Sequence, residues 1–128
     1  MIPGKEILMF ESLNKTTVRT VKEGINTDDM DFVALYDKKR GLWPEAVGKE
    51  LPVDGFFFTE SKKYGKQVVV ITLGYKVNLP KRYVETFEEI RDNKDMLDAV
   101  LAGKLKLTNI KEIDSANGKT AAFTLADA

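Results

Sequence analysis

Apolar and polar residues are ordered most clearly in the middle of the chain. Residues 53–60 (VDGFFFTE) and 67–79 (QVVVITLGYKVNL) are rich in β-branched and aromatic side chains, which is typical of strands. The stretch SKKYG joins them, and its Gly65 supplies the left-handed backbone that a short hairpin loop needs. The pattern predicts a central hairpin whose second strand bends at a bulge at Gly74 and ends at Pro80.

A helical period replaces this pattern after Pro80. Val84, Phe87 and Ile90 recur every three residues, so they share one face of a helix. A second apolar series continues to Gly103, a typical helix stop, and its members are Met96, Leu97, Val100 and Leu101. We therefore expect a helical segment with one apolar face after the central hairpin.

Alternation returns in the last part of the chain. Residues 104–113 (KLKLTNIKEI) and 119–127 (KTAAFTLAD) alternate in the manner of two strands. The stretch SANG between them carries the Asn-Gly pair of a tight hairpin turn. This predicts a second hairpin.

The signals before the central hairpin are weaker. Half-buried strands are expected at 16–25 and 32–37, with a capping loop at 26–31 between them. Residues 42–52 are expected to be irregular, because Pro and Gly interrupt them, and residues 7–10 are expected to form a short strand or an anchor.

The order of these elements suggests a fold. In an OB-type barrel, a helix lies between the third and fourth strands and plugs one end. We expect a single domain over residues 1–128, of the α+β class and mostly β, with an OB-like five-stranded barrel. Other α+β arrangements of the same elements fit almost as well.

Composition excludes several kinds of chemistry. The 128 residues include no His and no Cys, so there is no Ser-His-Asp triad, no thiolate nucleophile and no usual zinc ligand set. No glycine-rich phosphate loop is present. We expect a protein that is not an enzyme, with no catalytic residues, no cofactor and no metal site. A carboxylate-dependent hydrolase using Asp28, Asp29 and Asp31 is a third, less favoured hypothesis, because a solvated loop explains these acids better.

The same composition bears on location. No stretch approaches the roughly 20 apolar residues that span a bilayer, and the first ten residues lack the pattern of a secretory signal. Together with the absence of cysteine, this predicts a cytoplasmic protein with no membrane partner.

Charge is balanced overall but not locally. The chain carries 20 basic and 20 acidic residues. Residues 60–82 have six basic residues and one acidic one, an excess of +5, whereas residues 83–101 have an excess of −4. A neutral protein with one basic segment attracts anions locally without binding polyanions indiscriminately.

The basic segment contains three consecutive phenylalanines. Side chains alternate along a strand, so Phe57 faces away from Phe56 and Phe58. With Phe57 in the core, Phe56 and Phe58 would form a two-ring platform outside. The alternative is that both faces of the hairpin are buried, one by the barrel and one by the helix or a partner subunit.

An exposed platform beside cations is typical of single-strand nucleic-acid binding, in which bases stack on rings and cations follow the phosphates. This hypothesis takes single-stranded DNA as the partner, with RNA as an open alternative and no strong sequence preference. Its binding residues would be Phe56, Phe58, Lys62, Lys63, Tyr64, Lys66, Tyr75, Lys76, Lys81 and Arg82.

Two pairs of residues, one inside this set and one outside it, each have two interpretations. Lys81 and Arg82 open the helical segment, where they would either bind a phosphate or pair with Glu85 and Glu88 one turn later. Tyr36 and Trp43 flank a basic turn and would be either a second stacking site or a hydrophobic cap on an open barrel.

The stretch VDGFFFTESKKYGKQVVVIT, followed by LPKR and NGKT, resembles small single-stranded DNA-binding or replication-accessory proteins of phages and mobile elements. The resemblance covers roughly residues 48–125. It implies an OB-like fold that binds a single strand during replication or recombination, with contacts at Phe58, Lys62, Lys63, Tyr64 and Lys66. The end of the chain, TLADA, departs from the acidic tail with which cellular single-strand binders usually recruit partners.

A function of another class fits the same residues. In a structural or protein-interaction module, the apolar central hairpin would be an oligomer interface, as large exposed apolar patches often are. Binding that weakens with salt would distinguish phosphate contacts from such an interface.

Overall fold

The computed structural model of the protein describes residues 19–116 and 118–128, so the expectation for residues 7–10 lies outside the described residues. The described strands and helices follow in chain order as β1 (Phe32–Ala34), β2 (Tyr36–Asp37), β3 (Gly41–Leu42), η1 (Pro44–Ala46), β4 (Leu51–Pro52), β5 (Gly55–Ser61), β6 (Gly65–Thr72), β7 (Tyr75–Asn78), η2 (Lys81–Tyr83), α2 (Val84–Asp92), α3 (Lys94–Leu101), β8 (Leu105–Ser115) and β9 (Gly118–Asp127). The elements η1 and η2 are single 3₁₀ turns.

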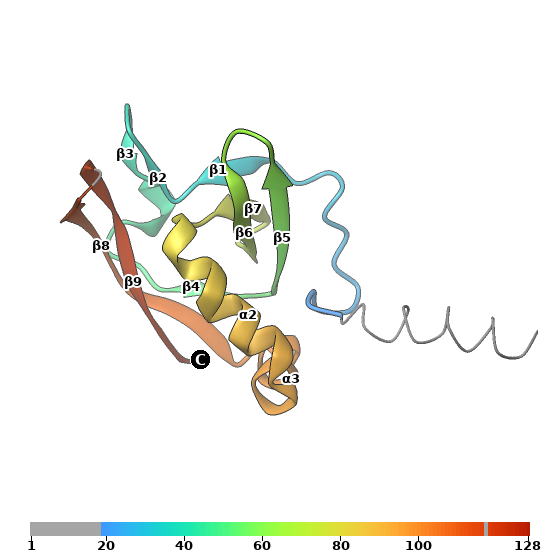
Figure 1. Ribbon diagram of the computed structural model, residues 1–128. Coiled ribbons are helices and arrows are strands. Elements are labelled where there is room, and N and C mark those ends of the chain that lie inside the picture. The colour runs from blue at the N-terminus through green and yellow to red at the C-terminus, as the bar shows by residue number, and fades with distance from the viewer. Residues whose placement is uncertain (1–18, 117) are drawn as a thin grey trace, which may run out of the picture.

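A four-stranded sheet with the order β1-β7-β6-β5 forms the larger layer (Figure 1). Strand β6 is antiparallel to both β5 and β7, whereas β1 runs parallel to β7. One face of this sheet carries Phe56, Val70 and Val77 in register, and all three are fully buried. This core face packs on α2, which lies between the β5–β6 and β8–β9 hairpins in Figure 1.

The second layer is a three-stranded sheet with the order β4-β8-β9. The chain passes from this sheet to the first one within residues 51–61, because Leu51 pairs with Leu107 and Phe56 pairs with Val70. At the crossing, Val53 N donates to Leu105 O at 2.9 Å. The two sheets and the helices thus share one core along this side of the molecule.

The opposite side is not closed by a backbone ladder. The outer edge of β7 is taken by β1, and β9 remains the edge of its own sheet. The α+β class with mostly strands is therefore confirmed, and the helices do lie between β7 and β8 as expected. The five-stranded closed barrel is not observed in the described part of the chain, which has open sheets instead.

The segment predicted to be a two-stranded central hairpin contains three strands, β5, β6 and β7. Residues 67–79 are not one strand with a bulge, because Leu73 and Gly74 form a tight turn that reverses the chain between β6 and β7. Both residues have positive φ, 52° and 80°, which matches the turn that joins two antiparallel strands. The extra reversal makes β7 the partner of β1.

Two expected strands at the start of the chain are shorter than predicted. Residues 32–37 divide into β1 and β2, because Leu35 bonds to Asn78 O through its N–H and to Trp43 N through its carbonyl. In the described part of 16–25, only Val21 forms a bridge, to Gly55. Residues 42–52, expected to be irregular, contain the 3₁₀ turn η1 and the short strand β4. The second predicted hairpin, β8 with β9, is confirmed, with an irregularity between Thr108 and Lys111.

Candidate nucleic-acid interface

The three phenylalanines face the opposite way from the expected platform. Phe56 is fully buried, and its ring lies 5.1 Å from that of Phe87 on α2. The prediction that Phe56 lies outside is therefore wrong. Strand alternation separates Phe57 from its neighbours but does not say which side the helix will cover. Because α2 covers the side of Phe56, it is Phe57 that points outward.

Phe58 lies on the helix side as well, under a cover of charged side chains. The Lys66 ammonium lies 4.8 Å from the centre of its ring, and the Arg91 guanidinium lies 5.3 Å away. Lys66 also bonds to Glu88 at 2.7 Å. The expected roles of Phe58 and Lys66 as nucleic-acid contacts are not supported by this geometry, because both side chains are engaged with α2.

Two further expected contacts are engaged within the fold. The Tyr75 ring packs edge-on against Trp43 at 5.4 Å, and both rings belong to the core or its border. This places Trp43 as the hydrophobic cap rather than as a free stacking site. Arg82 donates to Ala121 O at 2.6 Å and lies over the ring of Tyr83, so its guanidinium holds η2 to β9.

The outer face of the four-stranded sheet carries a different aromatic pair. Phe57 and Phe32 meet edge to face, with ring centres 6.4 Å apart. Phe32 is 58% exposed, and the Lys76 ammonium lies 4.3 Å from the centre of its ring. The sequence predicted a cation beside two outward-facing rings; here the rings are Phe32, which is exposed, and Phe57, which is partly exposed, instead of Phe56 and Phe58.

Polar side chains continue this face towards the hairpin loop. Asn78 donates to Gln67 across the sheet at 3.0 Å, and Thr59 pairs with Gln67 in the β5–β6 register. We call the group Phe32, Phe57, Gln67, Lys76 and Asn78 the aromatic face. Its apolar neighbours Val69 and Ile71 are buried, so the accessible surface consists of rings, amides and a cation.

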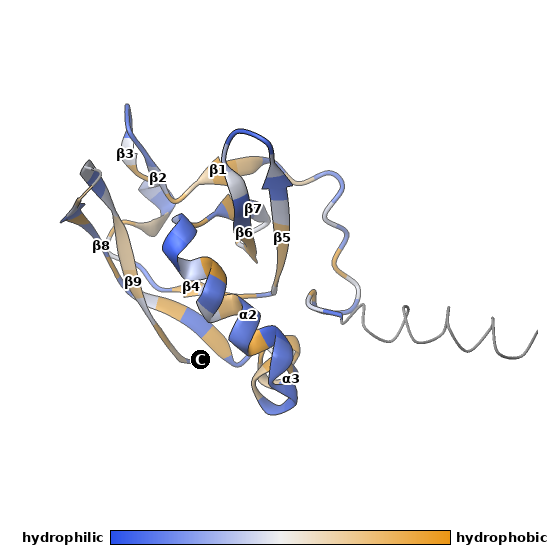
Figure 2. Ribbon diagram, in the orientation of Figure 1, coloured by the Kyte–Doolittle hydropathy of each residue, from blue (hydrophilic) through white to orange (hydrophobic). Residues whose placement is uncertain are grey.

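The loop between β5 and β6 adds exposed cations and a third ring. It is hydrophilic in Figure 2, and Tyr64 at its tip is 58% exposed. Ser61 Oγ accepts from Tyr64 N at 3.0 Å, which shapes the turn, and the Lys63 ammonium lies 5.2 Å from the Tyr64 ring. Lys81 reaches the base of the loop, since a Cβ built on Gly65 would lie 3.1 Å from its Nζ.

The lysines near the aromatic face and the β5–β6 loop differ from the basic residues of the helices in their ion pairing. Within residues 19–116 and 118–128, none of Lys62, Lys63, Lys76 and Lys81 lies at salt-bridge distance from a carboxylate. The alternative in which Lys81 and Arg82 pair with Glu85 and Glu88 is thus not observed, and Glu88 is paired with Lys66. The four lysines remain available to an anion.

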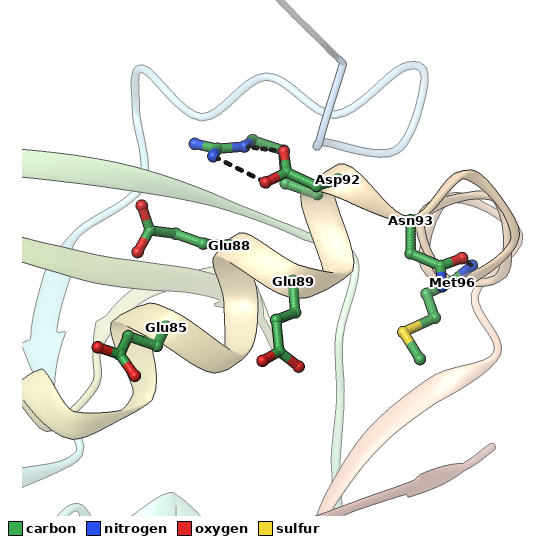
Figure 3. Close-up of a pocket in the computed structure, with 7 residues that line it drawn as sticks. Glu85, Glu88, Glu89, Asp92, Asn93 and Met96 are labelled. Atoms are coloured by element: carbon green, nitrogen blue, oxygen red, sulfur yellow. Dashed lines mark hydrogen bonds and ion pairs between the residues drawn. The ribbon is translucent and has the colours of Figure 1, made fainter.

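The opposite side of the molecule is acidic. A hollow of about 670 Å³ runs along α2 and the start of α3, and its lining consists of Glu85, Glu88, Glu89, Arg91, Asp92, Asn93 and Met96. Figure 3 shows Glu85, Glu88, Glu89 and Asp92 projecting from α2. The one cation of the hollow is engaged, because Arg91 Nε bonds to Asp92 Oδ1 at 3.0 Å. This contact raises the pKa of Arg91 and lowers that of Asp92. Since α2 covers the core face, the acidic surface and the aromatic face lie on opposite sides of the sheet, and a polyanion is favoured on only one of them.

The hydrolase hypothesis gains no metal centre from the fold. In the described residues, no three acidic side chains are grouped in a way that holds a metal ion, and this includes Asp28, Asp29 and Asp31. No helix in the same residues is long and apolar enough to cross a membrane.

Once the side that the helix covers is known, strand alternation is enough to assign Phe57 to the outer face. No sequence pattern assigns Phe32 to that face. Phe32 joins the site only because β1 pairs in parallel with β7, which brings Phe32 opposite Lys76.

Three comparisons with known proteins give no match: no family model fits the sequence, and no curated protein or solved structure is significantly similar to it.

Proposed function

We propose that the protein binds single-stranded nucleic acid, DNA in the first instance, on the aromatic face and the adjoining β5–β6 loop. The observation that carries the proposal is the exposed ring of Phe32 next to the partly exposed ring of Phe57, beside Lys76. Each base stacked on a ring contributes roughly 1–3 kcal/mol, whatever the base. Binding would therefore have little sequence preference, and it would involve no chemistry on the strand.

The loop supports the same proposal through charge. Lys62 and Lys63 precede Tyr64 in the loop, the Lys63 ammonium lies near the Tyr64 ring, and Lys81 reaches Gly65 at the base of the loop; no described carboxylate pairs with these lysines. A phosphate backbone that runs from the rings to this loop meets cations at both ends. Each neutralised phosphate releases counterions and makes the affinity depend on salt.

The arrangement of strands agrees with an OB-like ancestry, which remains part of the proposal. OB-folds bind oligonucleotides on the face of their second and third strands and on the loop between the first two. With residues 51–61 as the first strand, β6 and β7 take these positions, and they carry Gln67, Lys76 and Asn78. The resemblance of SKKYGKQ and LPKR to small single-stranded DNA-binding proteins of phages and mobile elements supports a role in phage or mobile-element replication or recombination. The absence of cysteine supports the cytoplasm as the place of this role.

Self-association through the same rings is the second candidate. Phe32 is among the most exposed large apolar side chains of the described residues, and exposed apolar patches often mark protein interfaces. A second copy would bury Phe32 and Phe57 without any need for the surrounding lysines.

Fluorescence anisotropy of a labelled oligo-dT, at low and high salt and beside a duplex of equal length, tests the proposal. We expect tight single-strand binding that weakens steeply with salt and a much weaker duplex signal. Phe57→Ala should weaken binding about tenfold, within the roughly 1–3 kcal/mol of one stacked base. Met96→Ala is the matched control, because Met96 is 51% exposed on the acidic side. Binding that is absent at low salt, or equal in Phe57→Ala and the parent protein, would overturn the proposal. A Phe57-dependent dimer in light scattering would then favour self-association.

A further inference from the structure

A cavity adjoins the aromatic face at the outer edge of β1. It has a volume of about 240 Å³ and lies between β1 and the β2–β3 hairpin, which are neighbours in Figure 1. Its walls are Phe32, Val33, Ala34, Asp37, Arg40, Gly41, Leu42, Trp43 and Pro44. Phe32 belongs to both the cavity and the aromatic face, so a strand stacked on that face passes the mouth of the cavity.

The backbone of β1, three residues of which line the cavity, has hydrogen-bonding groups on its outer edge that no described strand pairs with. Asp31 O accepts from Lys76 N at 2.9 Å, and Leu35 N donates to Asn78 O at 2.9 Å. Odd-numbered residues of this stretch thus bond to β7, and the N–H and C=O groups of Phe32 and Ala34 point the other way, to the open edge. Because β1 is the last strand of its sheet, no further strand pairs with them in the described part of the chain. Such groups are costly to leave unpaired away from water and suit the polar edge of a ligand.

Charge at the mouth favours an anion. The β2–β3 turn carries Lys38, Lys39 and Arg40 against Asp37 alone, and Arg40 lines the cavity. The Asp37 carboxylate is held by the turn itself, since it accepts from Lys39 N at 2.7 Å and from Arg40 N at 3.3 Å. The Arg40 side chain is exposed and forms no ion pair with a described residue.

We infer that this cavity takes one nucleotide of the bound strand, with Phe32 and the free edge of β1 against its base and Arg40 against its phosphate. The inference rests on the proposed function and extends it from a flat stacking surface to a pocket. A donor and an acceptor on each backbone residue can pair with the polar edge of any base, so the pocket adds affinity with little sequence preference. A peptide strand on the same edge is less favoured, because β1 offers only three residues for pairing and the rim is cationic.

The chain contains a single tryptophan, and it lines this cavity. Trp43 emission therefore comes from one residue, whose ring packs on Tyr75 in the core and lines the cavity. We expect unlabelled oligo-dT to change Trp43 emission with the same midpoint as the anisotropy of labelled oligo-dT. This measurement needs no variant.

Two variants of the β2–β3 turn distinguish a contact at the cavity from the general effect of positive charge on binding. Arg40→Ala should weaken oligo-dT binding about tenfold and reduce the Trp43 response, because it removes the phosphate contact at the rim. Lys39→Ala makes the same change of charge in a side chain that does not line the cavity, and should weaken binding less than about twofold. Circular dichroism of both variants checks that the turn still folds.

The outcomes distinguish this inference from the proposed function. If oligo-dT binds in a Phe57-dependent way but Trp43 emission does not change and the two variants bind equally, the cavity is empty in the complex and the inference is wrong, while the proposed function stands. If oligo-dT does not bind at all, both fail. A Trp43 response that Arg40→Ala reduces and Lys39→Ala leaves intact supports the inference.

Discussion

The ring of Tyr83 lies flat on the ring of Phe123, with the ring centres 4.0 Å apart and the planes 19° from parallel. The Tyr83 hydroxyl also accepts a hydrogen bond from Phe123 N at 3.1 Å. Next to it, Arg82 donates to Ala121 O at 2.6 Å. These are backbone groups on the free edge of β9, where a closed barrel would place another strand. Arg82 and Tyr83 of η2 thus form hydrogen bonds with backbone groups on the edge of β9 that has no strand partner among the described residues. We call this contact between η2 and β9 the seam.

The first prediction concerns this seam. Tyr83→Phe keeps the stacked ring but removes the acceptor of Phe123 N, and should lower the free energy of unfolding by about 1 kcal/mol. Tyr83→Ala also removes the stacking and should cost roughly 1 kcal/mol more. Urea unfolding measures both. Tyr64→Phe makes the same change at an exposed ring and should leave stability unaltered, so an equal loss in the two Tyr→Phe variants would contradict the role of the seam.

The elements with strong local signals were predictable from the sequence. The β8–β9 hairpin follows from clean alternation and an Asn-Gly turn, and the helices follow from apolar residues at helical spacing and the stop at Gly103. In both places the local preference agrees with the element that forms, although Met96 of the expected apolar series is 51% exposed. The same agreement held for Gly65, whose φ of 72° fits the loop predicted around it.

The predictions that were wrong concerned strand pairing and contacts between distant parts of the sequence. An apolar run such as VVVITLGYKV reads as one strand whether or not it turns, and only the positive φ of Leu73 and Gly74 shows the reversal. The parallel pairing of β1 with β7 joins residues about 44 positions apart, and no local pattern encodes it. For the same reason the sequence predicted a platform of Phe56 and Phe58, whereas Phe56 is buried and the rings that meet beside Lys76 are Phe57 of β5 and Phe32 of β1.

The second prediction compares neighbouring phenylalanines. Phe56→Ala empties a fully buried site against Phe87 and should lower the free energy of unfolding by about 3–5 kcal/mol. Phe57→Ala lies on the outer face and should cost much less stability, while it weakens single-strand binding. Thermal unfolding and anisotropy on the same two proteins check this contrast. The reverse order of stabilities would mean that Phe57 is the core residue after all.

The third prediction separates binding cations from structural ones. Lys63→Ala should reduce the slope of log affinity against log salt by about 0.7, the contribution of one phosphate on a single strand. Lys94→Ala is the matched control, because Lys94 pairs with Asp98 on the helical side at 2.8 Å. Its slope should equal that of the parent protein. Titrations at several salt concentrations give both slopes, and equal slopes in the two variants would remove Lys63 from the binding surface.

The fourth prediction concerns pH. Hydrogen bonds from Lys39 N and Arg40 N lower the pKa of Asp37 below its ordinary value of 3.8. A carboxylate whose pKa is lowered by folding stabilises the turn fully above its ordinary pKa, and this stabilisation is lost as the pH falls through the folded-state pKa. The chemical shift of the Asp37 carboxyl carbon, followed by NMR from pH 7 downward, should show a midpoint below 3.8. A midpoint at or above that value would show that the turn does not hold the carboxylate, and Asp37→Asn should remove the transition altogether.

The last prediction concerns the contact between the start of the described chain and the sheet. A Cβ on Gly55 would lie 2.5 Å from Val21 Cα and 2.8 Å from Thr20 O, so any side chain there collides with backbone. Gly55→Ala should push residues 20–22 away and break the bonds from Phe56 N to Thr20 O and from Lys22 N to Asp54 O. We expect a loss of roughly 2 kcal/mol of stability and faster hydrogen exchange at these two amides. Gly24 also has a positive φ, 85° against 155° at Gly55, but nothing lies within 4 Å of its built Cβ, so Gly24→Ala adds backbone strain without a collision. We expect Gly55→Ala to lose more stability than Gly24→Ala. If both lose the same stability and exchange at the Lys22 and Phe56 amides is unchanged, residues 20–22 do not hold the edge of β5 in solution.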